Sequence, residues 1–172
     1  MFFEDIKNQI IGIDEVGRGA FCGPVVSCSI LSSENILKHD LVYQITDSKK
    51  LNEKKKILIT KFIKNNSIYH IGKATNQEID KLNILQATIL SMKRSYAKFD
   101  FYKNFVKIDG IKTFDLNKRT KFIIGGDSKS LSIAAASIVA KTWRDKLMIY
   151  YSKFYPNYKW DKNKGYGTKE HR

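Results

Sequence analysis

The sequence contains little cysteine and little proline, and it has few acidic residues relative to basic ones. Of its 172 residues, 2 are cysteines and 2 are prolines, so a disulfide framework is excluded. Cys22 and Cys28 lack the spacing of a zinc motif, and we expect two reduced, partly buried thiols in a cytoplasmic protein. The N-terminus carries acids where a signal peptide is basic. The longest apolar run, residues 133–140, is too short and too rich in serine to span a bilayer.

The shortage of acidic residues leaves a surplus of positive charge. Lys and Arg number 31 against 17 Asp and Glu, which gives a formal net charge of +14. Such a surplus is typical of proteins that bind polyanions, usually nucleic acids, because neutralising phosphates releases counterions. A solvated surface in a lysine-rich proteome would explain much of the same surplus, so charge alone does not decide the function.

The hydrophobic pattern predicts strands that alternate with helices. Strands are expected at residues 10–14, 25–31, 67–73, 105–109 and 122–124. Helices are expected at residues 53–64, from 76 to about 98, and at 132–154. Asn52 and Thr75 are the expected N-caps of the first two helices, and Ile57, Leu58 and Phe62 are expected on one face of the first. This order predicts an α/β sheet with helices on its faces, in a single domain over residues 1–172.

Acidic residues stand at the ends of three predicted strands. Asp14 and Glu15 end the first, Asp109 ends the fourth, and Asp127 follows the fifth. Ligands gather at the carboxyl ends of strands in open α/β sheets, so four carboxylates would converge if these strands were neighbours. Oxygen ligands without His or Cys favour Mg²⁺ or Mn²⁺ over zinc, and two such ions suit hydrolysis of a phosphodiester. Any one acid could equally cap a turn, and Gly-Gly-Asp-Ser around Asp127 is also an ordinary turn.

Five blocks of sequence, in order along nearly the whole chain, carry a resemblance to a known family. The first is Gly-Ile-Asp-Glu-Val-Gly-Arg-Gly at residues 12–19, followed by Gly-Pro-Val-Val at 23–26. The second is Asp-Ser-Lys-Lys-Leu at 47–51, and the third is Asp-Gly at 109–110. The fourth is Gly-Asp-Ser-Lys-Ser at 126–130, which leads into the alanine-rich residues 134–145. The last is Lys-Gly-Tyr-Gly-Thr-Lys-Glu-His at 164–171. Together they resemble bacterial ribonuclease HII, a type 2 RNase H.

The resemblance implies an RNase H-like fold, a mixed five-stranded sheet flanked by helices on both faces. It implies a metal-dependent endoribonuclease that hydrolyses the RNA strand of RNA–DNA hybrids. Such an enzyme would also nick 5′ of single ribonucleotides embedded in duplex DNA, by two-metal-ion catalysis, leaving 5′-phosphate and 3′-hydroxyl ends. The implied setting is ribonucleotide excision repair and RNA primer removal in the cytoplasm, away from membranes, with a monomer as the default state.

The resemblance also assigns roles to particular residues. The metal ligands and catalytic residues, which would hold Mg²⁺ or Mn²⁺ at a two-metal site, would be Asp14, Glu15, Asp109 and Asp127. The turn that would read the ribonucleotide's 2′-hydroxyl, the group that separates RNA from DNA, is Gly17, Arg18 and Gly19. Tyr166 would stack on the sugar of the following deoxynucleotide. Candidates for phosphate contacts, each otherwise a solvated lysine, are Lys49, Lys50, Lys141 and Lys169. His171 is expected to be merely exposed.

Three other interpretations compete with this one. Ribonuclease HIII shares the Asp-Glu-Val-Gly start but is expected to carry an extra N-terminal domain and no arginine in the glycine turn. Another RNase H-like enzyme, such as a resolvase or an exonuclease, would lack the Gly-Arg-Gly and Gly-Tyr-Gly-Thr pair. A non-catalytic nucleic-acid-binding module would have no reason to keep four carboxylates together. Many relatives continue past the last block with a helical tail that contacts DNA and is short or absent here, so the sequence leaves the affinity for DNA open.

Overall fold

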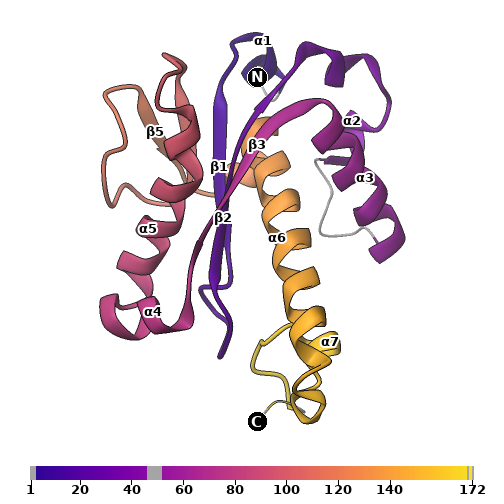
Figure 1. Cartoon of the computed structure of the whole chain (residues 1–172). Coiled ribbons are helices and arrows are strands. Elements are labelled where there is room, and N and C mark those ends of the chain that lie inside the picture. Colours follow the sequence, from indigo (N-terminus) through magenta and orange to yellow (C-terminus); the bar gives the residue numbers. More distant parts are fainter. Residues whose placement is uncertain (1–2, 46–51, 170, 172) are drawn as a thin grey trace.

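The computed structural model describes residues 3–45, 52–169 and 171. At its centre lies a five-stranded sheet with the strand order β3-β2-β1-β4-β5 (Figure 1). The strands are β1 (Ile11–Val16), β2 (Val25–Ser32), β3 (Ser67–Ala74), β4 (Val106–Asp109) and β5 (Thr120–Ile123). β2 is antiparallel to β1 and β3, whereas β4 is parallel to β1 and β5. The predicted mixed sheet is confirmed, and every strand boundary lies within two residues of its prediction.

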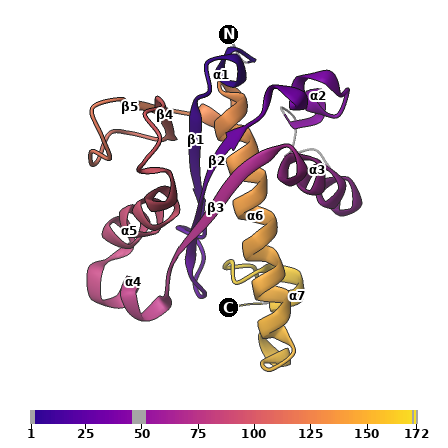
Figure 2. The same cartoon turned by 45° about the horizontal axis from the view of Figure 1, so that its top comes forward.

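Helices cover both faces of this sheet (Figures 1 and 2). On one face α6 (Leu131–Ser152) packs across β1 and β2, with α3 (Glu53–Asn65) beside it. On the other face α5 (Ile84–Tyr96) packs against β2 and β3. The remaining short helices are α1 (Glu4–Lys7), α2 (Val42–Ile45), α4 (Asn76–Leu82) and α7 (Trp160–Asn163), with 3₁₀ turns η1 (Glu34–Lys38), η3 (Ala97–Phe99), η4 (Gly126–Ser128) and η5 (Pro156–Tyr158). No helix among the described residues is long and apolar enough to cross a membrane.

Two apolar clusters hold these layers together, one on each face of the sheet. Cys28 and Ile30 of β2 belong to the cluster under α6, whereas Ile11 and Ile13 of β1 belong to the cluster with α5. Side chains two residues apart on a strand share a face, so this alternation also fixes where Asp14 points. Since Ile13 faces α5, the next residue, Asp14, faces α6.

Gly12 allows α6 to lie close against β1. A Cβ atom at this position would come within 2.2 Å of the backbone carbon of Ser132. The hydroxyl of Ser132 in turn donates to the carbonyl of Ile10 (3.0 Å). The start of α6 is therefore fixed directly over the strand that carries Asp14 and Glu15.

Two details of the helices differ from the sequence-based expectations. The helix expected from residue 76 to about 98 is divided at Asn83, whose φ of 69° interrupts the helical backbone and whose side chain caps α5. The predicted capping box of Thr75 and Glu78 is present at the start of α4. The expected face of α3 was wrong for Ile57 and Leu58, which are exposed, whereas Phe62 packs against the core as expected. The buried residues of α3 are Ile59, Thr60 and Ile63. Cys28 is buried and Cys22 half-buried, both as free thiols, as predicted.

Candidate active site

Three of the predicted metal ligands lie together at the centre of the sheet. Ile13 of β1 pairs with Ile108 of the parallel strand β4, so the next residues, Asp14 and Asp109, are neighbours on adjacent strands. Glu15 follows on β1, and its backbone N–H donates to Asp14 Oδ1 (2.7 Å). The parallel pairing of β1 with β4, which the sequence left open, is what brings these acids together.

The electrostatics of the three acids are unfavourable. Asp14 is 6% exposed, and its pKa is raised well above the usual value by burial first, then by repulsion from Glu15 and Asp109. A hydrogen bond from Ser137 of α6 offsets part of that rise. The pKa of Glu15 is also raised, chiefly by burial, although Arg18 lies 3.3 Å from its Oε1. Buried acids with raised pKa values are typical of functional sites.

A divalent cation fits what these residues lack. Oε2 of Glu15 is buried and has no hydrogen-bond partner in the part of the chain that the structure describes. A buried carboxylate oxygen without a partner costs free energy, and a hard cation is the natural ligand of such an oxygen. Among residues 3–45, 52–169 and 171, the structure contains no group of three or more Asp, Glu, His or Cys side chains arranged to hold a metal ion.

Asp127 lies on a loop that is tied to Asp109. The N–H of Gly126 donates to Asp109 Oδ1 at 2.6 Å, and Asp127 is the next residue, half-buried in η4. Gly126 has no room for a side chain, because a Cβ there would meet Ile133 of α6 at 2.5 Å. The loop that carries Asp127 is therefore held between the end of β4 and the start of α6.

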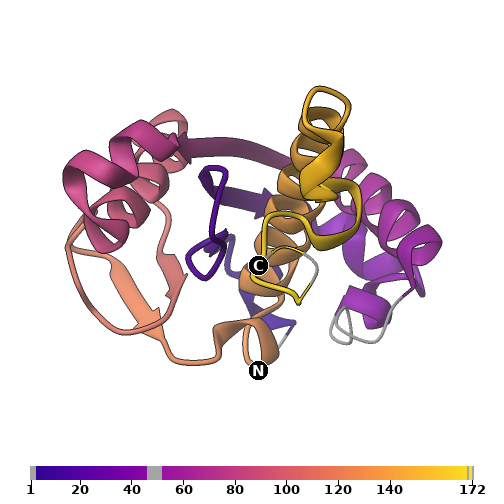
Figure 3. The ribbon, with the colours of Figure 1, turned by 90° about the horizontal axis from the view of Figure 1, so that it is seen from below.

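The Gly-Arg-Gly turn lies beside the loop that carries Tyr166, near the C-terminal end of the chain (Figure 3). Ala20 and Tyr166 form an isolated antiparallel β-bridge, and the N–H of Phe21 donates to the carbonyl of Gly165 (2.9 Å). Gly17 has a φ of +104°, and a Cβ there would come within 2.7 Å of the Pro24 carbonyl. Two motifs almost 150 residues apart thus form one surface next to the acids.

Arg144 of α6 holds the two loops together. Its side chain is fully buried and donates to the carbonyls of Pro24 (3.0 Å), Lys164 (2.7 Å) and Cys22 (2.9 Å). Its guanidinium carbon lies 5.3 Å from the centre of the Tyr166 ring. Burial lowers the pKa of Arg144, but a guanidinium keeps its charge in proteins. The sequence placed Arg144 only in a matching block, since neighbouring carbonyl groups leave no mark in a sequence.

His171 contacts the same loop and is not the merely exposed residue that the sequence suggested. Its Nδ1 lies 2.9 Å from the Tyr166 carbonyl, and the indole N–H of Trp160 donates to its Nε2 (3.2 Å). A carbonyl can only accept and an indole can only donate. Both bonds are satisfied by one form of the ring, the neutral tautomer with its proton on Nδ1.

The structure places two of the four lysines that were predicted to contact phosphates. Lys141 forms an ion pair with Asp145 (2.7 Å) and lies 5.0 Å from the centre of the Tyr166 ring, so it stands at the predicted substrate surface. Lys169 is exposed. Lys49 and Lys50, with the block of residues 47–51, lie outside the described residues.

Comparison with solved structures defines the class of fold. The RNase HII chain in the PCNA:RNase HII complex from Archaeoglobus fulgidus matches with a TM-score of 0.78 at 20% identity, covering 93% of this chain and 82% of that one. Bst-RNase HIII in complex with Mn²⁺ matches with a TM-score of 0.70 at 20% identity, covering 84% of this chain and 54% of that one. The fold is thus of the RNase H type, as the resemblance implied.

Sequence comparison then identifies the family. The ribonuclease HII family profile matches residues 11–172. Ribonuclease HII of Pelagibacter ubique is 47% identical over 163 residues, which cover 94% of this chain and 86% of the relative. Ribonuclease HII of Wolbachia pipientis subsp. Culex pipiens is 45% identical over 166 residues, covering 96% and 83%. The chain belongs to the ribonuclease HII family, whose members are endoribonucleases that act on RNA–DNA hybrids.

Proposed function

We propose that this protein hydrolyses the RNA strand of RNA–DNA hybrids and nicks duplex DNA on the 5′ side of an embedded single ribonucleotide. The products would be a 3′-hydroxyl and a 5′-phosphate. The observation that carries the proposal is the cluster of Asp14, Glu15 and Asp109, with its unpartnered Glu15 oxygen, beside the joined loops of the Gly-Arg-Gly turn and Tyr166. Such an activity would serve ribonucleotide excision repair and RNA primer removal.

The acids supply the reaction centre. Asp14, Glu15, Asp109 and Asp127 would hold two divalent cations, Mg²⁺ or Mn²⁺. Two such ions lower the pKa of the attacking water and offset charge on the leaving oxygen. Ser137 donates a hydrogen bond to Asp14 and so fixes the carboxylate that faces α6. Arg18, which is half-exposed beside Glu15, limits the negative charge that a phosphate would meet on approach.

The joined loops supply the selection of ribose. The backbone of residues 17–19 can approach a sugar closely because Gly17 and Gly19 have no side chains. Tyr166 would pack on the sugar of the next deoxynucleotide, where an extra hydroxyl would be crowded. Arg144 and His171 contact the Tyr166 loop without facing the acids, so we assign them to positioning rather than to catalysis.

A cleavage assay tests the proposal directly. The protein is incubated with Mg²⁺ or Mn²⁺ and a DNA duplex that holds one ribonucleotide, and the products are mapped at nucleotide resolution. We expect one nick on the 5′ side of the ribonucleotide, and its loss in Asp14→Asn and Asp109→Asn. Equal cutting of an all-DNA duplex, or a nick on the 3′ side, would overturn the proposal.

The role of Tyr166 is tested by comparing two substrates. We expect Tyr166→Ala to slow nicking at a single ribonucleotide by at least tenfold, and to slow cleavage of a long RNA–DNA hybrid less, because only the first requires the RNA-to-DNA junction. The ratio of kcat/KM on the two substrates measures this selectivity. An equal loss on both substrates would mean that Tyr166 does not sense the junction.

A further inference from the structure

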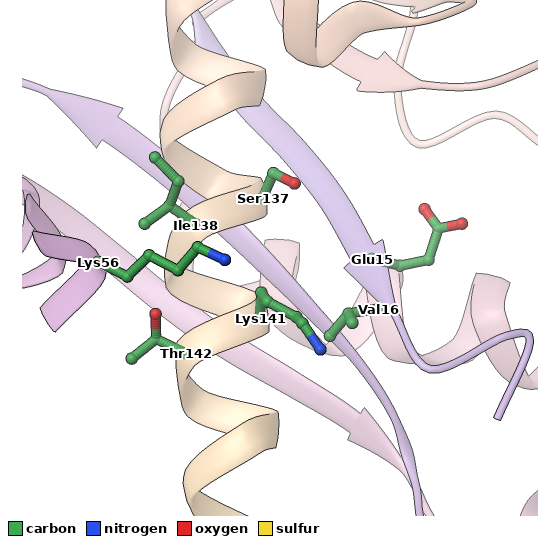
Figure 4. A pocket seen from close by; sticks show the side chains of 7 residues that line it. All are labelled: Glu15, Val16, Lys56, Ser137, Ile138, Lys141 and Thr142. Carbon is green, nitrogen blue, oxygen red and sulfur yellow. The ribbon is translucent and has the colours of Figure 1, made fainter. Parts of the chain in front are cut away.

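A pocket opens beside Glu15, between α3 and α6 (Figure 4). Its volume is about 290 Å³, and its lining residues are Glu15, Val16, Lys56, Ser137, Ile138, Lys141 and Thr142. That volume is roughly ten times the volume that one water molecule occupies in the liquid. The pocket thus has room for a phosphate group together with hydrating waters.

The charges in this pocket are not balanced. Lys141 already has a carboxylate partner, Asp145, at 2.7 Å. Lys56 comes from the opposite wall, on α3, and is half-buried. Within the residues that the structure describes, its amine has no hydrogen-bond or ion-pair partner. The Lys56 amine is directed from α3 toward α6, whereas the Lys141 amine points away from α3, toward Val16 (Figure 4). The uncompensated positive charge of the pocket is therefore that of Lys56.

We propose that this pocket binds a backbone phosphate of the nucleic-acid strand that is being cut, with Lys56 as its main contact. The inference rests on the proposed function, because it takes the carboxylate cluster as the place where the scissile phosphate lies. Glu15 belongs both to the carboxylate cluster and to the pocket wall. A strand whose scissile phosphate lies at the cluster would bring a neighbouring phosphate to this wall of the pocket.

The chemistry of the contact determines its role. A lysine amine is a compact positive charge with three donors, well suited to a phosphate oxygen. Phosphate contacts fix the register of a strand but carry no sequence information. The contact at Lys56 thus holds the scissile linkage in register with the acids, whatever the bases nearby.

The chain offers matched controls for a test of this contact. Lys54 and Lys55 lie on the same helix, carry the same charge and are exposed. We expect Lys56→Ala to raise KM for nicking about tenfold with kcat within about twofold, and to reduce the salt dependence of binding by about one phosphate contact. Lys54→Ala and Lys55→Ala should each change KM less than twofold, and Lys56→Arg should restore most of the loss. Unchanged thermal midpoints would exclude misfolding.

A neutral linkage then locates the phosphate. Duplexes are prepared with one methylphosphonate at each linkage on either side of the ribonucleotide. Their affinities are measured in the Asp109→Asn background, which leaves the duplex uncut, with and without the added Lys56→Ala substitution. At one position, and at that position alone, the neutral linkage should abolish the difference in affinity between these two proteins. Binding is measured without cleavage, so this result stands apart from the proposed activity.

Several outcomes would overturn the inference. One is a Lys56→Ala protein that behaves like the Lys54→Ala and Lys55→Ala controls. Another is a Lys56-dependent loss of affinity that persists at every neutral linkage. Lys56-dependent binding of inorganic phosphate with unchanged duplex affinity would instead make the pocket a free-anion site. Failure of the wild-type protein to nick any substrate would contradict the proposed function, and the affinities would still decide the role of Lys56.

Discussion

Among single residues, Asp14 and Glu15 weaken the fold that they belong to. Both acids are largely buried, both have raised pKa values, and Asp14 is further raised by repulsion from Glu15 and Asp109. An oxygen of Glu15 also lacks a partner among the described residues. Active-site residues commonly lower the free energy of unfolding in this way. A cation at the cluster would remove both costs at once.

The first prediction is that Asp14→Asn stabilises the metal-free protein while abolishing cleavage. The substitution removes a buried charge and its repulsion from Glu15 and Asp109. A gain of ~1 kcal/mol in the free energy of unfolding would raise Tm by about 2–4 °C in a domain of this size. Thermal unfolding at pH 7 with a chelator measures it. A Tm below that of the wild type would show that Asp14 supports the fold.

The second prediction concerns pH. When the pKa of an acid is higher in the folded state, the folded protein binds more protons, so the free energy of unfolding falls as pH rises from the unfolded toward the folded pKa. Both acids therefore destabilise the metal-free protein most at neutral pH and above. We expect Asp14→Asn to gain most over the wild type at pH 7, and the gain to shrink as pH falls below the folded pKa. Adding Mg²⁺ should stabilise the wild type more than the variant.

The third prediction concerns His171, whose neutral ring bridges the Tyr166 carbonyl and the Trp160 indole. Phenylalanine keeps a ring of similar size but makes neither hydrogen bond. We expect His171→Phe to slow single-ribonucleotide nicking about tenfold while a long hybrid is affected less. If His171 acts through Tyr166, the same change in a Tyr166→Ala background should cost almost nothing further. Full additivity would refute positioning.

Where helices meet the sheet, small side chains set the spacing. Ser27 and Ser29 of β2 form hydrogen bonds with Ser91 and Ser95 of α5 (2.5 and 2.7 Å), and Gly12 lets α6 approach β1 on the opposite face. These contacts set the distance of α5 from β2 and of α6 from β1, the strand that carries Asp14 and Glu15. The precision of the site is thus built into the packing of α5 and α6.

The fourth prediction follows from that packing. Gly12→Ala would place a Cβ within 2.2 Å of the Ser132 backbone, and a helix backbone cannot yield as a side chain can. Overpacking of this kind costs about 1–3 kcal/mol or more, so Tm should fall by several degrees. Gly19→Ala is the control for stability, because no atom lies within 4 Å of the added Cβ. Equal Tm values for the two variants would show that α6 can shift freely.

The sequence predicted the strands well because alternating apolar residues and capping motifs are local signals. It predicted Asp14, Glu15 and Asp109 as a group because their strand ends are visible in the sequence, although the parallel pairing that joins them is not. The sequence did not predict the break at Asn83, because an apolar pattern continues across it. The buried face of α3 was assigned only in part, because the position of α6 is not visible in the sequence. The roles of Arg144 and His171 were not predicted. Arg144 binds backbone carbonyls, two of them 120 and 122 residues away, and His171 binds a carbonyl and an indole whose positions depend on the fold of the loop.

The whole molecule carries a formal net charge of +14, yet it also contains a group of mutually repelling carboxylates at the centre of the sheet. The two features have opposite effects on a nucleic acid. The positive net charge would attract a duplex at long range, whereas the acids would repel the scissile phosphate until cations offset their charge. Binding of the duplex and assembly of the reaction centre are therefore expected to respond differently to ionic conditions.

The last prediction separates these responses. If Lys56 and the four candidate lysines Lys49, Lys50, Lys141 and Lys169 contact phosphates, log KM should rise with log salt with a slope of roughly 4.5, about 0.9 per contact. Between 50 and 200 mM monovalent salt that amounts to roughly a five-hundredfold rise. kcat, measured at saturating substrate and fixed Mg²⁺, should change little, because cations held by carboxylates are not displaced by monovalent salt at these concentrations. An all-DNA duplex should show the same slope in binding, since phosphate contacts do not read the sugar or the base. A slope near one would leave the basic surface without a role in substrate binding, and a parallel fall in kcat would place the salt effect in the reaction centre itself.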